Sequence, residues 1–441
     1  MPDLKTKSAK FVKAAFLICL IFGGAAARAQ TNKTPIIVVP GLVGSELVNQ
    51  KTGERVWFNV GRSKRDDLRL PLSPDLTAMR DNLAPRDALR SVKIGLAPRE
   101  LLYGSLIEAI KQSGYDETSW EKPKAANAVY IFAYDWRRDN VENARLLINK
   151  IERLKSDLGQ PDLKFNIVAH SMGGLLARYA AMYGDADLPQ ENEKNEPDWR
   201  GAKHFNKIIL LGTPNAGSLV ALESLATRFA LFSFNLDLPF VQNFTKFDVF
   251  TIPSVFQLLP INLRAFDENL KPIKIDVFDE QTWRKYNWGA LGDRKFSTEF
   301  NAADRQNAPA YFRRALERAR RFHQALNAES QTPNSISFSL VGGDCENTTD
   351  AVVVYQDEQS KIWKTIFKPM GLTNASGRKI PRAEMRKIII APGDGIVSKN
   401  SLLAADALQT RGQPQFHCEG HNKLVANSAI QTTIFRLLAE N

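Results

Sequence analysis

The order in which strand-like and helix-like segments alternate is the feature that most constrains this chain. Six apolar runs, several of them rich in β-branched or aromatic residues, predict strands at residues 35–41, 127–136, 164–171, 205–214, 335–343 and 386–395. Between them, residues 99–115 and 140–159 repeat apolar side chains at helical spacing, and each helical pattern ends at or beside a glycine. Strands that alternate with helices predict βαβ units and an α/β fold with a doubly wound, mostly parallel sheet.

Ser171 lies where the third predicted strand meets a helical pattern. The apolar run before it and the glycines after it are typical of a nucleophile mounted on a sharp strand-to-helix turn. Such a turn needs small residues two positions before and after the serine, and Ala169 and Gly173 fill them as an A-x-S-x-G variant. The alternative is a serine that only begins a helix.

A nucleophilic serine needs a histidine base, which should follow a late strand. His421 lies in a loop before a C-terminal amphipathic pattern and is the preferred base, and His417 is the weaker candidate. His170 is fixed beside the serine and excluded as the base. His204 and His323 precede the late strands.

The acid that orients the base should also follow a late strand. Asp394 lies in a glycine-flanked loop directly after a strong apolar run, and Asp344 is the rival after the preceding strand. An aspartate beside glycine is also ordinary turn chemistry, so either residue could have only that role.

An acyl-transfer site needs backbone donors for a developing oxyanion. The N–H of Met172, directly after the serine, is one expected donor. The N–H of Leu42, in the loop after the first strand, is the other. The alternative for that loop is a plain Pro-Gly turn.

Two segments interrupt the alternation: a proline-rich stretch at about 48–98 and a longer one at about 229–330. The second begins with a cluster of eight phenylalanines, namely Phe229, Phe232, Phe234, Phe240, Phe244, Phe247, Phe250 and Phe256. So much aromatic surface outside the sheet predicts a lipid-facing lid or acyl pocket, and the alternative is an ordinary insertion core.

The N-terminus has the pattern of a secretory signal over residues 1–29, with a basic start, an apolar stretch and an Ala27-Arg28-Ala29 cleavage site. An uncleaved anchor is the alternative. Cleavage removes five basic residues and one acidic residue, which lowers the net charge from +11 to +7. This charge, spread along the chain, does not suit a nucleic-acid binder but would help at an anionic lipid surface. Periplasmic or extracellular localisation is expected.

Cleavage also removes Cys19 and leaves Cys345 and Cys418. Two cysteines in an oxidising compartment are a disulfide candidate, and two buried free thiols are the alternative. An arginine cluster at residues 313–321 predicts a solvated helix face rather than a site for anionic headgroups.

The ordered motifs VVPGLVGSEL, WFNV, FAYDWRRD, IVAHSMGG, LGTPNAGS, PSVFQLLP, GDGIVSKNSL and GHNKLV resemble those of the lecithin:cholesterol acyltransferase family, which includes lysosomal phospholipase A2 and phospholipid:diacylglycerol acyltransferases. The resemblance implies one α/β-hydrolase domain over residues 30–441, with a loop-rich membrane-binding or lid segment at about 48–98 and a cap at about 229–330. It implies a triad of Ser171, Asp394 and His421, oxyanion donors at Leu42 and Met172, and scaffolding by the Tyr134–Arg137 motif. A late disulfide in the family supports Cys345–Cys418, whereas the cysteine-bridged early lid of mammalian members has no counterpart in residues 48–98.

These features predict an exported serine acyl hydrolase or O-acyltransferase. It would act on phospholipid acyl esters through an acyl-Ser171 intermediate, in peripheral contact with a membrane or lipid surface. The alternatives are a neutral-lipid lipase or carboxylesterase, and an inactive lipid-binding relative. No metal or cofactor is expected.

Overall fold

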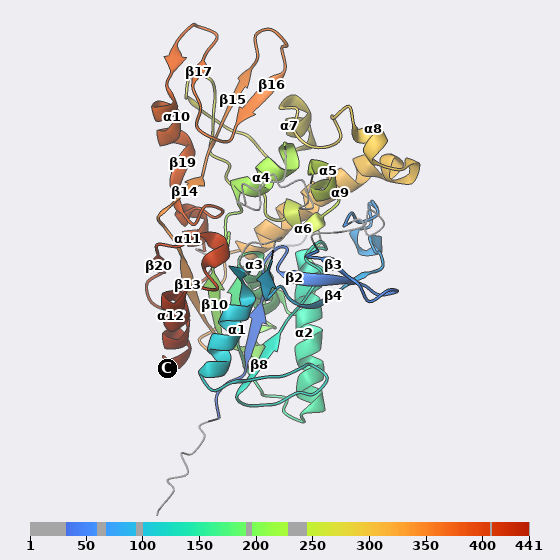
Figure 1. Ribbon diagram of the computed structural model, residues 1–441, viewed down its shortest axis with the longest axis vertical. Helices are drawn as coiled ribbons and strands as arrows, with labels where there is room; N and C mark the ends of the chain where they lie inside the picture. The colour runs from blue at the N-terminus through green and yellow to red at the C-terminus, as the bar shows by residue number, and fades with distance from the viewer. Residues whose placement is uncertain are drawn as a thin grey trace, which may run out of the picture. The chain divides into compact units, whose positions relative to one another are not determined.

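Seven parallel strands form the central sheet of the computed structural model (Figure 1), in the order β20-β13-β10-β9-β1-β8-β7. The structure describes residues 32–59, 68–93, 100–190, 196–227, 245–405 and 408–440, and the predicted signal at 1–29 lies outside them. From Lys33 onward the chain is one unit. The strands are β1 (Ile36–Val39), β7 (Asp116–Glu117), β8 (Ala128–Ile131), β9 (Phe165–His170), β10 (Phe205–Leu211), β13 (Ser337–Gly343) and β20 (Gln415–His417).

Helices cover both faces of this sheet, as expected for a doubly wound fold. One apolar core packs α2 (Asn140–Asp157) and α3 (Met172–Tyr183) against one face, and a second packs α1 (Tyr103–Gln112) and α12 (Ser428–Ala439) against the other. The three central strands β1, β9 and β10 are almost entirely buried. The prediction of an α/β fold with a parallel sheet is therefore confirmed.

The segment after β1 contains regular structure where loops were expected. A three-stranded antiparallel sheet is built from β2 (Ser45–Asn49), β3 (Arg55–Trp57) and β4 (Leu83–Ala88). Trp57 is buried in the main core, with its ring 5.5 Å from that of Trp136. The short pair β5 (Ser91–Val92) and β6 (Glu100–Leu101) follows.

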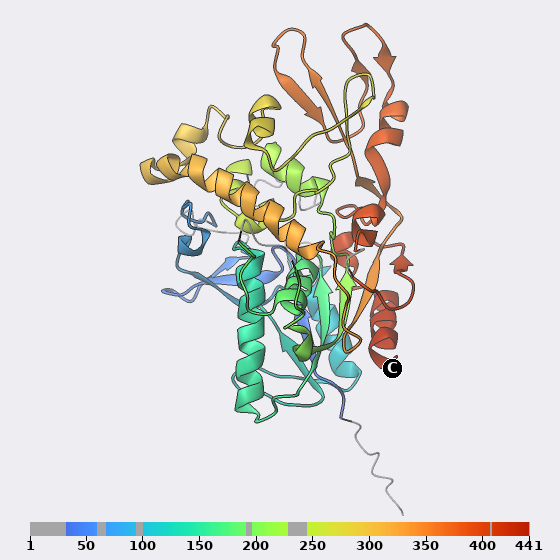
Figure 2. The same ribbon diagram turned by 180° about the vertical axis from the view of Figure 1, so that it is seen from behind.

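A cap lies over the carboxyl ends of the central strands (Figures 1 and 2). The 25-residue helix α9 (Ala302–Leu326) crosses it and packs against α3. The other cap helices are α4 (Leu219–Ala226), α5 (Lys246–Phe250), α6 (Pro253–Phe256), α7 (Glu280–Lys285) and α8 (Phe296–Glu299). 

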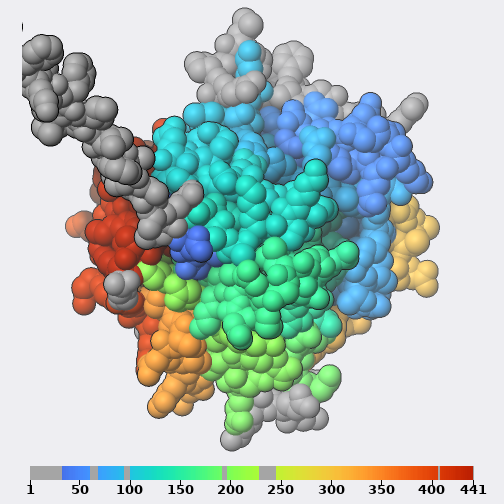
Figure 3. Space-filling model, turned by 90° about the horizontal axis from the view of Figure 1, so that it is seen from below, coloured from blue at the N-terminus to red at the C-terminus, as the bar shows by residue number. Residues whose placement is uncertain are grey.

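A second group of short strands lies beyond the cap. β11 (Ala265–Phe266), β12 (Pro272–Ile273), β15 (Val352–Gln356) and β16 (Trp363–Ile366) form one sheet, and β17 (Leu372–Thr373) pairs with β18 (Lys379–Ile380). In Figures 1 and 2 the β15–β16 and β17–β18 hairpins project from the cap end of the molecule. Figure 3 views the opposite end, where the region from α1 to α3 occupies most of the face.

The last strand predicted for the central sheet, at residues 386–395, is wrong. That run begins inside α10 (Arg382–Ile389) and continues as β19 (Ile390–Gly393), which pairs antiparallel with β14 (Glu346–Thr349). Ile389 of α10 packs into a small core with Val353, Ile366, Ile380 and Met385, so the apolar run forms part of a buried helix face as well as a strand. The strand next to β13 is instead β20, followed by α12 after a short turn; α11 (Lys399–Leu403) precedes β20.

Candidate functional site

Ser171 occupies the sharp turn between β9 and α3. Its backbone has φ +55° and ψ −128°, a conformation that a non-glycine residue adopts only when its surroundings force it. Gly173 lies against the backbone of the first-strand loop, since a Cβ at that position would meet Pro40 O at 2.4 Å. The buried Ala169 and Gly173 are thus the small neighbours that the strand-to-helix turn was expected to require.

Hydrogen bonds connect Ser171 to a histidine and an aspartate from distant parts of the chain. His421 Nε2 lies 2.9 Å from Ser171 Oγ, and His421 Nδ1 lies 2.7 Å from Asp394 Oδ2. All three residues are at most 9 % exposed. In neutral His421, Nδ1–H donates to the carboxylate, which leaves Nε2 free to accept the serine proton. The structure therefore brings together the three residues chosen from the sequence.

The Asp394 carboxylate is itself fixed by backbone donors. Its Oδ1 accepts from the N–H of Ile396 at 3.0 Å and of Val397 at 2.7 Å, while its backbone oxygen accepts from the N–H of His421 at 2.8 Å. One oxygen holds the loop and the other faces the imidazole. This division sets the orientation of the acid before any substrate arrives.

The rival residues have other partners. Asp344 Oδ2 lies 3.3 Å from Lys399 Nζ, and His417 Nε2 lies 3.1 Å from the hydroxyl of Thr433. His204 lies beside Lys155 at the far end of β10, and His323 lies on α9. The structure joins none of these four to Ser171.

The loop after β1 passes directly over Ser171. A Cβ on Gly41 would lie 2.7 Å from Ser171 Cβ, so only glycine fits there. The Gly41 N–H donates to the hydroxyl of Tyr103 at 2.8 Å. The next N–H, that of Leu42, makes no hydrogen bond with any other described residue. The N–H of Met172 is the first of α3 and has no acceptor within the helix. Met172 is thus the residue after the serine, and Leu42 follows the glycine that packs against the serine.

His170, which sequence reasoning had only excluded, joins the two loops that surround Ser171. Its Nε2 lies 3.2 Å from the backbone oxygen of His421, and its Nδ1 lies 2.7 Å from the hydroxyl of Tyr103. A carbonyl oxygen can only accept, so Nε2 carries the proton and Nδ1 accepts from Tyr103. Burial, and secondarily the nearby His421, lowers the pKa of His170 well below its usual range and keeps the ring neutral.

The Tyr134–Arg137 motif braces the same loop from behind. The hydroxyl of Tyr134 donates to Pro40 O at 2.7 Å, and the indole N–H of Trp136 donates to Ser45 O at 3.1 Å. The fully buried Arg137 pairs with Asp81 and Asp135 at 2.6 and 2.8 Å. The bonds to Pro40 and Ser45 fix both ends of the turn that carries Leu42.

Comparison with known proteins identifies the family of this chain. A model of the lecithin:cholesterol acyltransferase family matches residues 87–312, about half of the chain. The chain belongs to the lecithin:cholesterol acyltransferase family. It is therefore a lipase- or acyltransferase-like α/β hydrolase, and lipid esters are the substrate class that this family implies.

Among solved structures, one with a TM-score above 0.5 supports the fold, and two others are similar at lower scores. The Tle4–Tli4 complex matches with a TM-score of 0.51 at 14 % identity, covering 93 % of this chain and 98 % of that one. The mature lipase BlEst2 from Bacillus licheniformis matches with a TM-score of 0.37 at 12 % identity, covering 92 % and 93 %. EstA from Clostridium botulinum matches with a TM-score of 0.36 at 14 % identity, covering 92 % and 87 %. A search of curated proteins gave no match.

A disulfide joins the loop after β13 to the loop after β20, which also carries His421. Cys345 follows β13 and Cys418 follows β20, and their sulfur atoms are bonded. The bond encloses the segment that includes Asp394 and ends three residues before His421. Gly343, two residues before Cys345, packs closely against Asp394. A Cβ at position 343 would lie 2.8 Å from Asp394 Cβ.

The described phenylalanines of the cap form its interior rather than a lipid-facing surface. Phe247, Phe250 and Phe256 are at most 5 % exposed. Phe250 and Phe256 pack with Tyr311 and Phe312 of α9, and Phe247 packs with Phe300. For these three, the insertion core set against the lid in the sequence analysis is the correct interpretation. The other five, Phe229, Phe232, Phe234, Phe240 and Phe244, lie outside the described residues.

The five arginines clustered at residues 313–321 of α9 are paired with acidic side chains. Arg318 is largely buried and reaches both Asp139 and Asp187. Each of the other four has a carboxylate within 4 Å: Arg313 with Glu280, Arg314 and Arg321 with Glu317, and Arg320 with Asp276. The cluster is therefore a helix face whose arginines are ion-paired, which leaves little unpaired positive charge for an anionic headgroup.

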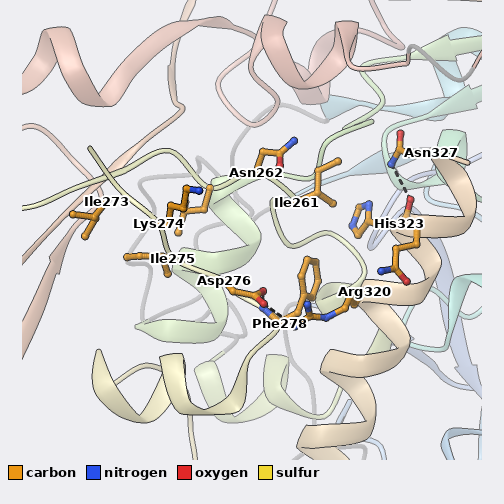
Figure 4. Close-up of a pocket in the computed structure, with 12 residues that line it drawn as sticks. Ile261, Asn262, Ile273, Lys274, Ile275, Asp276, Phe278, Arg320, His323 and Asn327 are labelled. Atoms are coloured by element: carbon orange, nitrogen blue, oxygen red, sulfur yellow. Dashed lines mark hydrogen bonds and ion pairs between the residues drawn. The ribbon is translucent and has the colours of Figure 1, made fainter. Parts of the chain in front are cut away.

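A groove of about 640 Å³ lies between the C-terminal half of α9 and residues 261–278 (Figure 4). Its walls include Phe278 and His323, with ring centroids 6.0 Å apart, and the Arg320–Asp276 pair. Burial lowers the pKa of His323 to about 3, with Arg178 adding to the shift, so this ring is neutral near pH 7. Neither Ser171 nor its partners line the groove, and we assign it no catalytic role.

Among the described residues, no group of three or more His, Cys, Asp or Glu side chains is arranged to hold a metal ion. In the same part of the chain, no helix combines the length and the apolar character needed to cross a membrane.

Proposed function

We propose that this protein is an exported serine acyl hydrolase or O-acyltransferase that cleaves phospholipid acyl esters. The observation that carries the proposal is the unbroken hydrogen-bond path Ser171–His421–Asp394 in a member of a lipid acyltransferase family. We assign Ser171 as nucleophile, His421 as general base and then acid, and Asp394 as the group that orients the imidazole.

The first half-reaction forms an acyl-enzyme. Ser171 Oγ attacks the ester carbonyl carbon while its proton moves to His421 Nε2. The resulting oxyanion is held by the N–H groups of Leu42 and Met172. Collapse of this intermediate breaks the ester C–O bond, and His421 returns the proton to the departing lysophospholipid oxygen. Ser171 then carries the acyl group as an ester.

The second half-reaction repeats these steps with a new acceptor. Water or a lipid alcohol gives its proton to His421 Nε2 as its oxygen attacks the acyl-Ser171 carbonyl. Collapse breaks the bond to Ser171 Oγ, and His421 reprotonates the serine. Water yields a free fatty acid, and an alcohol yields a new ester.

Export is part of the same proposal. The signal-like residues 1–29 and the Cys345–Cys418 bond both suit a periplasmic or extracellular protein. The localisation is tested by fractionating producing cells and reading the N-terminal sequence of the recovered chain, which should begin at Gln30.

The activity is tested by incubating the chain from Gln30 with acyl-labelled phosphatidylcholine, with and without a sterol, beside Ser171→Ala. Labelled free fatty acid alone identifies a hydrolase, and a labelled sterol ester identifies a transferase. Turnover of triacylglycerol or simple esters without phosphatidylcholine would replace the phospholipid by a neutral substrate. Equal turnover by Ser171→Ala would refute the mechanism.

A further inference from the structure

Of the net charge of +7 expected after cleavage of residues 1–29, +5 lies in one segment, contrary to the even spread expected from the sequence. Residues 352–389, here called the hairpin surface, hold the β15–β16 and β17–β18 hairpins and α10. They contain three acidic residues and eight basic ones, which are Lys361, Lys364, Lys368, Arg378, Lys379, Arg382, Arg386 and Lys387. All eight basic residues are exposed.

Most of this charge is not neutralised locally. Only two ion pairs form within the hairpin surface, Lys364 with Asp357 and Arg378 with Glu384, both at 2.6 Å. The other six cations have no carboxylate within 4 Å among the described residues, although Arg386 donates to Asn347. The five arginines clustered at residues 313–321 of α9 are each paired with a carboxylate, so these six cations are free where those five are not.

Exposed aliphatic side chains accompany the free lysines. Ile362 is 48 % exposed beside Lys361, and Met370 is 49 % exposed two residues after Lys368. They are two of the five large hydrophobic side chains that are strongly exposed in the described part of the chain. A lysine ammonium next to an aliphatic group suits the boundary between lipid headgroups and acyl chains better than it suits bulk water.

The hairpins are held in place from behind. Val353, Ile366, Ile380, Met385 and Ile389 form a small buried core that joins both hairpins to α10. The free cations are thus presented on an ordered scaffold. Figures 1 and 2 place this scaffold at the cap end of the molecule, the end toward which the carboxyl ends of the central strands point.

We propose that the hairpin surface docks on an anionic lipid bilayer. Attraction between the free cations and acidic headgroups supplies the binding, and Ile362 and Met370 enter the headgroup region. The inference rests on the proposed function in one respect: docking is useful because it would bring the cap end and the Ser171 site to a lipid substrate. The binding itself needs no catalysis.

The test uses the chain from Gln30 carrying Ser171→Ala, because the apolar stretch of the signal would bind vesicles unaided. Co-sedimentation is measured with vesicles of phosphatidylcholine alone or mixed with phosphatidylglycerol. Binding is expected only to the mixed vesicles, and it should weaken as salt is raised. Lys361→Glu/Lys368→Glu/Lys379→Glu should weaken it at least about tenfold, and Ile362→Ser/Met370→Ser should weaken it less.

The matched control reverses three exposed cations at the opposite end, Lys122→Glu/Arg153→Glu/Lys203→Glu. Lys122 and Lys203 precede strands β8 and β10, and Arg153 lies in the last turns of α2. This variant has the same net charge as the hairpin variant, so equal weakening by both would overturn the proposal. Equal binding to both vesicle types would also overturn it.

Two further outcomes separate alternatives. Unchanged vesicle binding of the hairpin variant, with weaker retention on immobilised heparin, would assign the surface to a soluble polyanion and overturn lipid docking. Both charge variants, with Ser171 restored, should cleave a soluble short-chain ester at the parental rate, which shows that they are folded. If the chain with Ser171 and no charge substitution did not cleave the ester, the proposed function would be refuted. The vesicle-binding result would still stand.

Discussion

The rings of His170 and His421 lie side by side with centroids 4.8 Å apart, and His170 Nε2 donates to the backbone oxygen of His421. His170 also accepts from Tyr103, which in turn accepts from Gly41 N–H. His170 therefore links the loop of the proposed base, through Tyr103, to the loop that carries Leu42, one of the two proposed oxyanion donors.

Replacing His170 should impair catalysis more than folding. We expect His170→Ala to lower kcat/KM on a soluble ester by about 10²-fold, because displacement of reacting groups by an ångström has costs of that order. His170→Gln can still donate an amide N–H and should retain more activity. Tyr103→Phe should cause a smaller loss. Unchanged kcat/KM in His170→Ala, with Tm also unchanged, would show that the link has no positioning role.

Removing the charge of Asp394 should be far more harmful than removing that of Asp344. Asp394→Asn would favour the wrong tautomer of His421 and should lower kcat by about 10⁴-fold. Asp344→Asn breaks only the contact with Lys399, so its kcat should stay near that of the parent. Steady-state kinetics on both variants decide the assignment, and a large loss in Asp344→Asn alone would transfer the role to that residue.

Breaking the disulfide should destabilise the protein and release the loop that carries His421. Reduction should lower the free energy of unfolding by about 2–4 kcal/mol, mainly by releasing a constraint on the unfolded chain. The chain from Gln30 contains only Cys345 and Cys418, so any effect of reductant on urea unfolding belongs to this bond. The double variant Cys345→Ala/Cys418→Ala should be insensitive to reductant.

Acid should destabilise the protein through its buried neutral histidines. His323 has its pKa lowered to about 3 in the folded chain, whereas an unfolded histidine titrates near 6.5. Between those values the unfolded state binds the extra proton, so folding stability falls as pH falls, by up to about 1.4 kcal/mol per pH unit for this residue. Above pH 6.5 the effect vanishes.

The change His323→Leu tests this dependence. Urea unfolding measured between pH 7 and pH 5 should show a flatter decline for His323→Leu than for the parent. Some decline should remain, because burial also lowers the pKa of His170 and His204. Identical slopes in parent and variant would contradict the assignment of a neutral buried His323.

The sequence predicts best where local pattern and chemistry coincide. Ser171 could be identified because its turn demands small residues at 169 and 173, and Asp394 and His421 because they follow late apolar runs. The apolar run before Asp394 was nonetheless assigned to the wrong sheet. Three isoleucines in a row suit a strand and a buried helix face equally, and only the distant partner strand β14 decides between them.

Features that depend on distant partners were not predictable. The role of His170 requires Tyr103 and Gly41, which are 67 and 129 positions away. The basic segment 352–389 could be counted in the sequence, but its free charge emerges only once ion pairs elsewhere are known. The same applies to the α9 arginines, whose acidic partners come from several separate segments.

The ladder between β14 and β19 places Glu346 opposite Gly393, so the chain leaves and rejoins the body of the protein at nearly one point. The segment between those strands is an insertion, here called the detour, whose two ends are held together by the β14–β19 pairing. Cys345 of the disulfide lies just before its first end, and Asp394 lies just after its second. Relatives could therefore lengthen, shorten or recompose this detour and acquire a different outer surface. The spacing of Ser171, Asp394 and His421 would be inherited unchanged.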